Sequence, residues 1–150
     1  MQERFETFTV LMNRISRNIR RIKNFEMAEY GLRSAHISCL YYLYASQGLT
    51  ATELCERCEE DKATISRALE YLEAHGYLRC GQQGVKRYKA PLLLTEKGME
   101  AGEKIAGKIS GVLDEIKVGL TDEERVAFYR SLSIISGNLD AVARSCGKKE

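Results

Sequence analysis

The sequence lacks the features that mark several large classes of protein. It contains one proline, two histidines and five cysteines in 150 residues. An odd number of cysteines suits reduced thiols better than a disulfide framework. No run of about 18 apolar residues is present, so we expect no membrane span, and the acidic start MQERFETF predicts no signal peptide. We therefore expect one cytoplasmic domain.

The motifs of common enzymes are missing as well. There is no phosphate-binding glycine loop, no Ser/His/Asp order and no helical His-x3-His pair. Four residues have a zinc-like spacing, namely Cys55, Cys58, His75 and Cys80. The predicted helix between Cys58 and His75 is roughly 20 Å long, however, which keeps these two side chains apart. We predict no enzyme, no metal site and no cofactor.

Charge is balanced overall but clustered locally. Lys and Arg total 23 against 21 for Asp and Glu. Five basic residues and no acid lie between Arg14 and Lys23, and four basic residues and no acid lie between Tyr77 and Ala90. Local positive potential attracts a polyanion, so nucleic acid is a candidate partner. The alternative for the first cluster is an ordinary solvated helix face.

Hydrophobic periodicity predicts a mostly helical chain. The first expected helix is long and amphipathic, with an apolar stripe that needs a covering partner, and the second is nearly all apolar. The expected helices are residues 3–29, 34–46, 50–58, 61–75 and 95–118, and a last helix from 121. Two capping boxes, Thr50 with Glu53 and Thr121 with Glu124, predict where two of these helices begin.

The helix after Asp61 has an unusual outer face. At about 100° per residue, its apolar residues share one side and its small or polar residues share the other. Ile65, Ala68, Leu69 and Leu72 share one face, and Ala63, Arg67, Glu70 and Ala74 lie opposite, with Thr64 and Ser66 on the flanks. A short helix, a turn and this helix form the pattern of a helix-turn-helix.

A DNA major groove admits one α-helix, and short side chains let its backbone approach the bases. We predict that Ala63, Thr64 and Ser66 lie against the groove. Arg67 has the length and planarity to read guanine O6 and N7, and Lys62 can reach a phosphate.

A basic hairpin follows this helix. Tyr77 to Cys80 and Tyr88 to Leu94 are expected strands, and Pro91 predicts that the second one lies at a sheet edge. We expect the hairpin to meet a minor groove or the DNA backbone through three basic residues, which are Lys86, Arg87 and Lys89. The alternative is a winged-helix protein-interaction module without sequence-specific DNA binding, but such a module has no need for these residues together.

Three segments in order resemble the MarR family of winged helix-turn-helix transcription regulators. They are TATELCERCEEDKATISRALEYLEAHGYL, LLLTEKG and GLTDEE. The resemblance covers nearly the whole chain and implies a mostly α fold with a small antiparallel β wing. It implies one MarR-type domain, with a DNA-binding lobe at residues 33–97 and an α-helical dimerisation body at residues 1–32 and 98–150.

The resemblance also implies function. Members commonly act as homodimeric repressors on pseudo-palindromic double-stranded DNA operators, and a small ligand, an oxidant or a metal releases them. The chain would then be nucleoid-associated when bound to DNA. By position, Thr50 and Thr52 would contact phosphate, while Arg87 would be the wing-tip arginine. The family wing often carries Asp-x-Arg, where this chain reads Lys86, Arg87 and Tyr88.

Effector candidates lie on the apolar second helix. His36, Tyr41 and Tyr44 are candidates for contacting a small-molecule effector, and the alternative is core and dimer packing. Cys39 is the candidate thiol sensor, because peroxide-sensing members of the family use a reactive cysteine in the dimer body. The alternative for Cys39 is a buried small hydrophobe.

Overall fold

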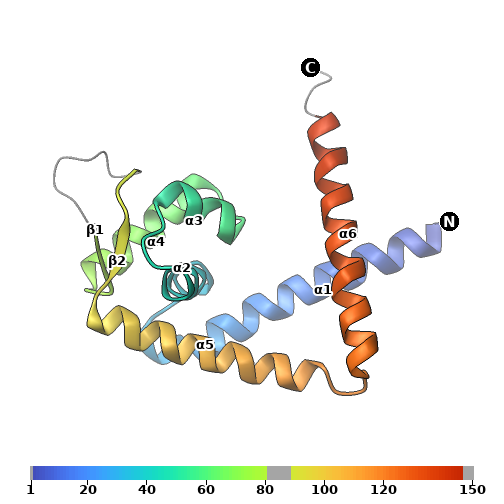
Figure 1. The fold of residues 1–150 in the computed structure, drawn as a ribbon, viewed down its shortest axis with the longest axis horizontal. Coiled ribbons are helices and arrows are strands. Elements are labelled where there is room, and N and C mark those ends of the chain that lie inside the picture. The colour runs from blue at the N-terminus through green and yellow to red at the C-terminus, as the bar shows by residue number, and fades with distance from the viewer. Residues whose placement is uncertain (1, 81–88, 147–150) are drawn as a thin grey trace. The chain divides into compact units, whose positions relative to one another are not determined.

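The computed structural model of the protein describes residues 2–80 and 89–146 (Figure 1). It is mostly helical with one small antiparallel sheet, which confirms the predicted fold class. The elements are α1 (Gln2–Glu26), η1 (Ala28–Tyr30), α2 (Ser34–Ala45), α3 (Ala51–Cys58), α4 (Lys62–Ala74), β1 (Leu78–Cys80), β2 (Leu92–Leu94), α5 (Glu96–Ile116) and α6 (Asp122–Cys146). Within the described residues, no helix is both long and apolar enough to cross a membrane.

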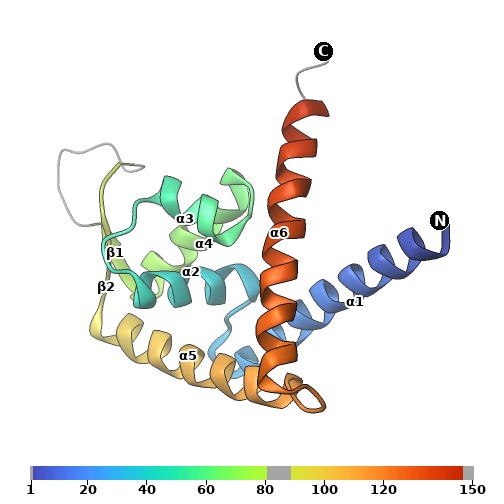
Figure 2. The ribbon, with the colours of Figure 1, turned by 45° about the vertical axis from the view of Figure 1, so that its right-hand side comes forward.

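Internal contacts divide the chain into two compact units, residues 1–109 and residues 110–150. The first unit holds the hydrophobic core, and α2 lies at its centre. Figure 2 shows α2 between the first half of α5 on one side and α3 with α4 on the other. Ile37, Cys39, Leu40 and Leu43 of α2 are all buried, which agrees with the prediction of a buried second helix.

Local capping bonds fix where the helices begin. Thr50 Oγ1 accepts a hydrogen bond from the Glu53 backbone N–H, and the Glu53 carboxylate accepts from the Thr50 N–H at 2.8 Å. Thr121 and Glu124 repeat this pattern at the start of α6. Both predicted capping boxes are therefore present, and each satisfies backbone donors that a helix start leaves unpaired.

The first helix ends earlier than the sequence predicts. α1 stops at Glu26, and Ala28–Tyr30 form a short 3-10 turn before Gly31, which has a φ of 68°. Met27 and Leu32 are buried at this corner. Burial of these two side chains turns the chain toward the core, and a helix continuing to residue 29 would not place them there.

The sheet is shorter than expected on its second strand. β1 and β2 pair in register Leu78↔Leu94, Arg79↔Leu93 and Cys80↔Leu92. The prediction that Pro91 lies within a strand is wrong: the proline directly precedes β2. The Leu92 N–H donates to the Leu49 carbonyl at 2.9 Å, so β2 also bonds to the segment that leads into α3.

Two glycines allow α5 to approach its neighbours closely. A Cβ on Gly98 would overlap the backbone carbonyl oxygen of Tyr77, and a Cβ on Gly102 would lie 2.6 Å from the Cβ of Tyr44. Thr95 secures the same corner, because its hydroxyl donates to the Gly76 carbonyl at 2.6 Å. The segment that follows α4 and the first turns of α5 are thereby joined.

Large apolar side chains remain exposed on α1 and, separately, on α6. On α1 they include Val10, Leu11, Ile15, Ile19, Ile22 and Phe25. On α6 they include Val126, Phe128, Ile134, Leu139 and Val142, and this helix buries no residue. Apolar surface of this extent is usually covered by a partner.

Candidate nucleic-acid interface

The helix-turn-helix is built from α3, a three-residue turn and α4. Glu59 closes α3 in the left-handed conformation, with φ 52° and ψ 37°. Ile65, Ala68, Leu69 and Leu72 then bury the inner face of α4 in the core. Lys62, Ala63, Ser66 and Arg67 are exposed on the opposite side, and Thr64 is half-buried between the faces. The predicted division of this helix into two faces agrees with the structure.

Asp61 organises the first turn of α4. Its carboxylate accepts the Thr64 backbone N–H and the Thr64 hydroxyl, each at 2.8 Å. These hydrogen bonds from Thr64 hold the pKa of Asp61 below its ordinary value, and Arg67 adds a smaller effect of the same sign. Arg67 Nη2 donates in turn to Thr64 Oγ1 at 3.3 Å. Asp61, Thr64 and Arg67 thus form one connected network on the exposed side of the helix.

This network changes the electrostatics expected at the helix start. A helix N-terminus attracts anions through its free N–H groups, but the side chain of Asp61 already occupies this end of α4. A phosphate there would face a carboxylate. Positive charge on this surface comes instead from Lys62 and from Arg67, whose guanidinium lies one turn along the helix.

Thr50 and Thr52, the predicted phosphate contacts, differ in their surroundings. The Thr50 hydroxyl donates to the Glu53 carboxylate at 2.8 Å while it accepts the Glu53 N–H. A phosphate contact from Thr50 Oγ1 would have to replace that donated bond. Thr52 lies on the first turn of α3 with its side chain exposed.

The predicted wing residues are only partly within the described structure. Lys86 and Arg87 lie outside the described residues, so their predicted contacts stay predictions. Lys89 is exposed, three residues before β2. Its position places a cation beside the root of the hairpin.

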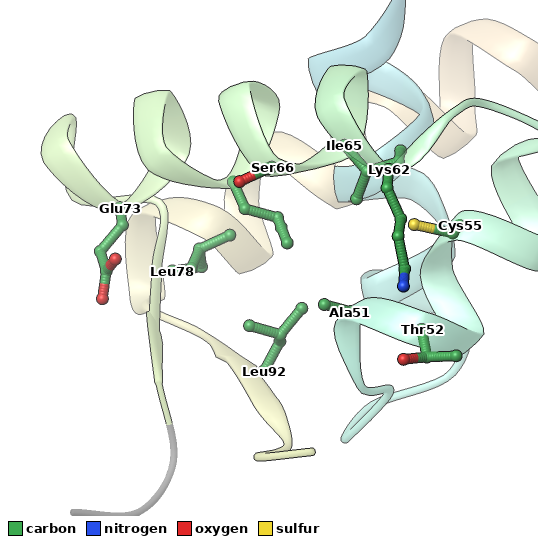
Figure 3. A pocket seen from close by; sticks show the side chains of 10 residues that line it. Ala51, Thr52, Cys55, Lys62, Ile65, Ser66, Glu73, Leu78 and Leu92 are labelled. Carbon is green, nitrogen blue, oxygen red and sulfur yellow. The ribbon is translucent and has the colours of Figure 1, made fainter. Parts of the chain in front are cut away.

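A hollow of about 310 Å³ lies between α3, α4 and the strand ends (Figure 3). Ala51, Ile65, Leu69, Leu78 and Leu92 give it an apolar lining, and Thr52, Cys55, Lys62, Ser66 and Glu73 complete it. In Figure 3, the Lys62 side chain extends along the hollow toward Thr52. No sequence motif predicts this hollow, because its walls come from four separate elements.

The effector candidates are held by internal contacts. His36 Nδ1 accepts the Arg33 backbone N–H at 3.1 Å, and its ring stacks on Tyr71 with centroids 4.3 Å apart. Burial, Arg33 and His75 together lower the pKa of His36. His75 stacks on Tyr71 at 3.9 Å. Sequence reasoning missed Tyr71, because a half-buried tyrosine on a helix carries no motif.

The remaining candidates also have packing roles. Tyr44 lies against Gly102 of α5, and Tyr41 meets Tyr42 edge to face at 5.4 Å. Cys39 is fully buried in α2. Across residues 2–80 and 89–146, no three His, Cys, Asp or Glu side chains are grouped so as to hold a metal ion.

Comparisons with known proteins find similarity to helix-turn-helix transcriptional regulators. A family model described as the MarR family matches residues 30–87. An uncharacterized HTH-type transcriptional regulator of Bacillus subtilis (strain 168), YwoH, is 27% identical over 117 residues, which are 78% of this chain and 85% of that protein.

Solved structures share the fold. A MarR family transcriptional regulator from Silicibacter pomeroyi is 29% identical with a TM-score of 0.74, covering 85% of this chain and 86% of that one. The S. aureus MepR–DNA complex is 19% identical with a TM-score of 0.79, covering 88% and 97%. A MarR regulator from Methanosarcina mazei Go1 is 22% identical with a TM-score of 0.79, covering 91% and 92%.

Proposed function

We propose that the chain is a winged-helix transcriptional regulator of the MarR family and that it acts as a sequence-specific repressor. In this proposal a homodimer binds a pseudo-palindromic double-stranded operator, and a small ligand or oxidant releases it. The MepR neighbour is a DNA complex, which supports the choice of DNA as partner.

The observation that carries the proposal is the outer face of α4. Its leading turns expose Lys62, Ala63, Ser66 and Arg67, while its inner face is fixed in the core. Small side chains permit close approach to base edges, and a bidentate arginine reads guanine. We propose that Ala63, Thr64 and Ser66 lie in the groove and that Arg67 reads a base.

In the free protein, Arg67 is held by Thr64 and Asp61 is close to both. On DNA, the Arg67 guanidinium would exchange its 3.3 Å contact with the Thr64 hydroxyl for base acceptors. Asp61 would then repel phosphates that approach the helix start from the wrong side. We propose that this repulsion helps to set the register of α4 on the duplex.

The homodimer is supported by the exposed apolar side chains of α1 and α6. Ile19 is 48% exposed and Phe25 is 81% exposed. Two copies of the chain that cover such surfaces would remove them from water. One recognition helix from each copy would then face one half-site.

For release, we propose that an effector acts on the lobe near His36, Tyr41 and Tyr44. These side chains lie on α2, which packs against the helices of the helix-turn-helix. His36 also stacks on Tyr71 of α4. A ligand that displaced this ring would therefore act directly on the recognition helix.

Arg67→Ala tests the reading role, and Arg17→Ala serves as its control. Both residues are exposed arginines on helices, so both variants lose one positive charge. We expect Arg67→Ala to weaken binding to the chain's own upstream DNA by about 1–3 kcal/mol and to relax base preference at one position. Arg17→Ala should keep the preference. Equal base discrimination in the wild type and in Arg67→Ala would contradict the assignment.

A further inference from the structure

Thr64, in the first turn of α4, already uses its hydrogen-bond donors within the chain. Its backbone N–H donates to Asp61 Oδ1 and its hydroxyl donates to Asp61 Oδ2, each at 2.8 Å. The hydroxyl oxygen also accepts a hydrogen bond from Arg67 Nη2 at 3.3 Å. A hydroxyl has one hydrogen and two lone pairs. The hydrogen and one lone pair of the Thr64 hydroxyl are therefore in use.

The bonds to Asp61 are the stronger part of this arrangement. A hydrogen bond to a carboxylate is roughly twice as strong as one between neutral groups. The hydrogen bonds from Thr64 also hold the pKa of Asp61 below its ordinary value, so Asp61 is ionised at neutral pH and keeps the Thr64 hydrogen. The longer contact is the one that Arg67 gives up when its guanidinium turns to a base. Even then, Thr64 has no hydrogen to donate to guanine O6 or N7, adenine N7 or thymine O4.

The other group on the Thr64 side chain is the Cγ2 methyl. Thr64 is half-buried between the two faces of α4, beside the exposed Ala63, whose whole side chain is a methyl. In the major groove, an apolar group has a specific counterpart, because thymine carries a C5 methyl there and the other three bases do not. The leading turn of α4 therefore offers DNA a surface suited to thymine.

We propose that the Thr64 methyl group selects a thymine next to the guanine that Arg67 reads. The assignment rests on the proposed function, since it gives a base to one residue of the proposed recognition surface. Thr64 and Arg67 are three residues apart, which is about 4.5 Å along one side of a helix. Base pairs are spaced by about 3.4 Å along the duplex, so the two side chains reach neighbouring base pairs.

Asp61 is the positioning residue in this proposal. Its two hydrogen bonds fix the rotamer of Thr64, because they hold the backbone N–H and the hydroxyl of the same residue on one carboxylate. The methyl group therefore keeps one place while Arg67 moves to its base. A thymine preference of this kind needs no polar group of Thr64 to be released.

The thymine methyl can be removed without changing base pairing, because deoxyuridine pairs with adenine as thymine does and lacks the C5 methyl. The purified full-length protein is titrated with duplexes of its own upstream DNA in which single thymines are replaced by deoxyuridine. We expect one such replacement to weaken wild-type binding about fourfold, the loss that corresponds to one buried methyl group. The sensitive thymine should lie beside the base pair at which Arg67→Ala relaxes preference.

Two variants separate the methyl of Thr64 from its hydroxyl. Thr64→Ser keeps the hydroxyl and its bonds to Asp61 but lacks the methyl. It should bind the thymine duplex about fourfold more weakly than the wild type does and should bind the deoxyuridine duplex equally well. Thr64→Val keeps a methyl in that place without the hydroxyl, so it should retain the preference for thymine. Because Thr64→Ser preserves the native hydrogen bonds, it decides the matter even where Thr64→Val folds poorly.

Ser66 is the matched control on the same helix. Its hydroxyl donates to Glu70 Oε1 at 3.4 Å, and its side chain has no methyl group. Ser66→Ala removes a hydroxyl from the same surface and should leave the ratio of the thymine and deoxyuridine affinities at its wild-type value. A changed ratio for Ser66→Ala together with an unchanged ratio for Thr64→Ser would overturn the assignment to Thr64.

The outcomes also separate the assignment from the proposed function. Equal binding to the native and scrambled duplexes would refute the proposed function, and the thymine assignment would fall with it. A preference for the native duplex without a deoxyuridine effect beside the guanine read by Arg67 would refute the thymine assignment alone. A Thr64→Val protein that loses the preference for thymine, while Thr64→Ser keeps it, would show that the hydroxyl and not the methyl reads the base.

Discussion

Gly102→Ala should destabilise the protein, although alanine is the better helix former. Gly102 lies within α5, and a Cβ built on it would be 2.6 Å from the Cβ of Tyr44 and 2.9 Å from its Cγ. Carbon atoms pack best at about 3.5–4.0 Å. The first atoms of the Tyr44 side chain cannot swing away without moving α2, so α5 and α2 must separate by roughly 1 Å.

The size of the effect follows from two opposing contributions. Overpacking of this kind costs about 1–3 kcal/mol, and replacing glycine by alanine within a helix returns up to about 1 kcal/mol. We therefore expect the free energy of unfolding to fall by about 1–2 kcal/mol. Gly107→Ala is the control on the same helix, because a Cβ there meets nothing within 4 Å. It should stabilise the protein by about 0.5–1 kcal/mol.

Urea denaturation at one fixed protein concentration measures both variants, since the proposed dimerisation would make stability depend on concentration. The two variants should shift the midpoint in opposite directions. A Gly102→Ala protein as stable as Gly107→Ala would refute the close packing of α5 on α2. It would also remove the packing role assigned to Tyr44.

Two further predictions concern the dimer and the cap of α4. Ile19→Glu places a charge on the exposed apolar side of α1 and should shift the protein from dimer to monomer by analytical ultracentrifugation. Asn18→Glu, which changes the exposed neighbouring residue, should leave the protein dimeric. An unchanged dimer for Ile19→Glu would show that α1 is not part of the interface. For the cap, hydrogen bonds from Thr64 hold the pKa of Asp61 below its ordinary 3.8. The ionised cap therefore stabilises the native state above that pH, and this contribution is lost as the pH falls through the lowered folded-state value. The melting temperature of the wild type, measured relative to that of Asp61→Asn, should decrease on acidification from about pH 6 to pH 2. A difference between the two melting temperatures that stays constant with pH would show that Asp61 does not cap α4 as an anion.

Local sequence signals predicted the helix starts well. Capping depends on residues three apart, as in Thr50 with Glu53 and Thr121 with Glu124, and such pairs are visible in the sequence. The two faces of α4 were also predictable, because a helical period alone sorts Ile65 from Arg67. These features need no knowledge of the rest of the fold.

Features that depend on tertiary packing were missed. The end of α1 is set by burial of Met27 and Leu32, and β2 begins at Leu92, whose N–H donates to the distant Leu49 carbonyl. The sequence places Cys58 among acidic residues, which argues against a thiolate. The fold instead brings Cys39 and Lys23 to it from α2 and α1, and these neighbours lower its pKa. No spacing rule reveals a contact between separate helices.

The stacked rings illustrate the same limit. His36 was an effector candidate by its place beside tyrosines on the apolar helix. In the structure, its Nδ1 caps α2 and its ring lies on Tyr71, a residue 35 positions later in the chain (71 − 36). A single sequence offers no means of pairing these two side chains.

The central claim, sequence-specific DNA binding, is tested most directly by one titration. The purified reduced protein is bound to its own upstream intergenic DNA and to a scrambled duplex across a salt series. We predict a preference of about a thousandfold or more for the native sequence and one dimer per site. Affinity should fall steeply with salt, by about 0.9 log units per tenfold salt increase for each phosphate contacted. Equal and weak binding to both duplexes would contradict the account and favour a winged-helix module that binds another protein.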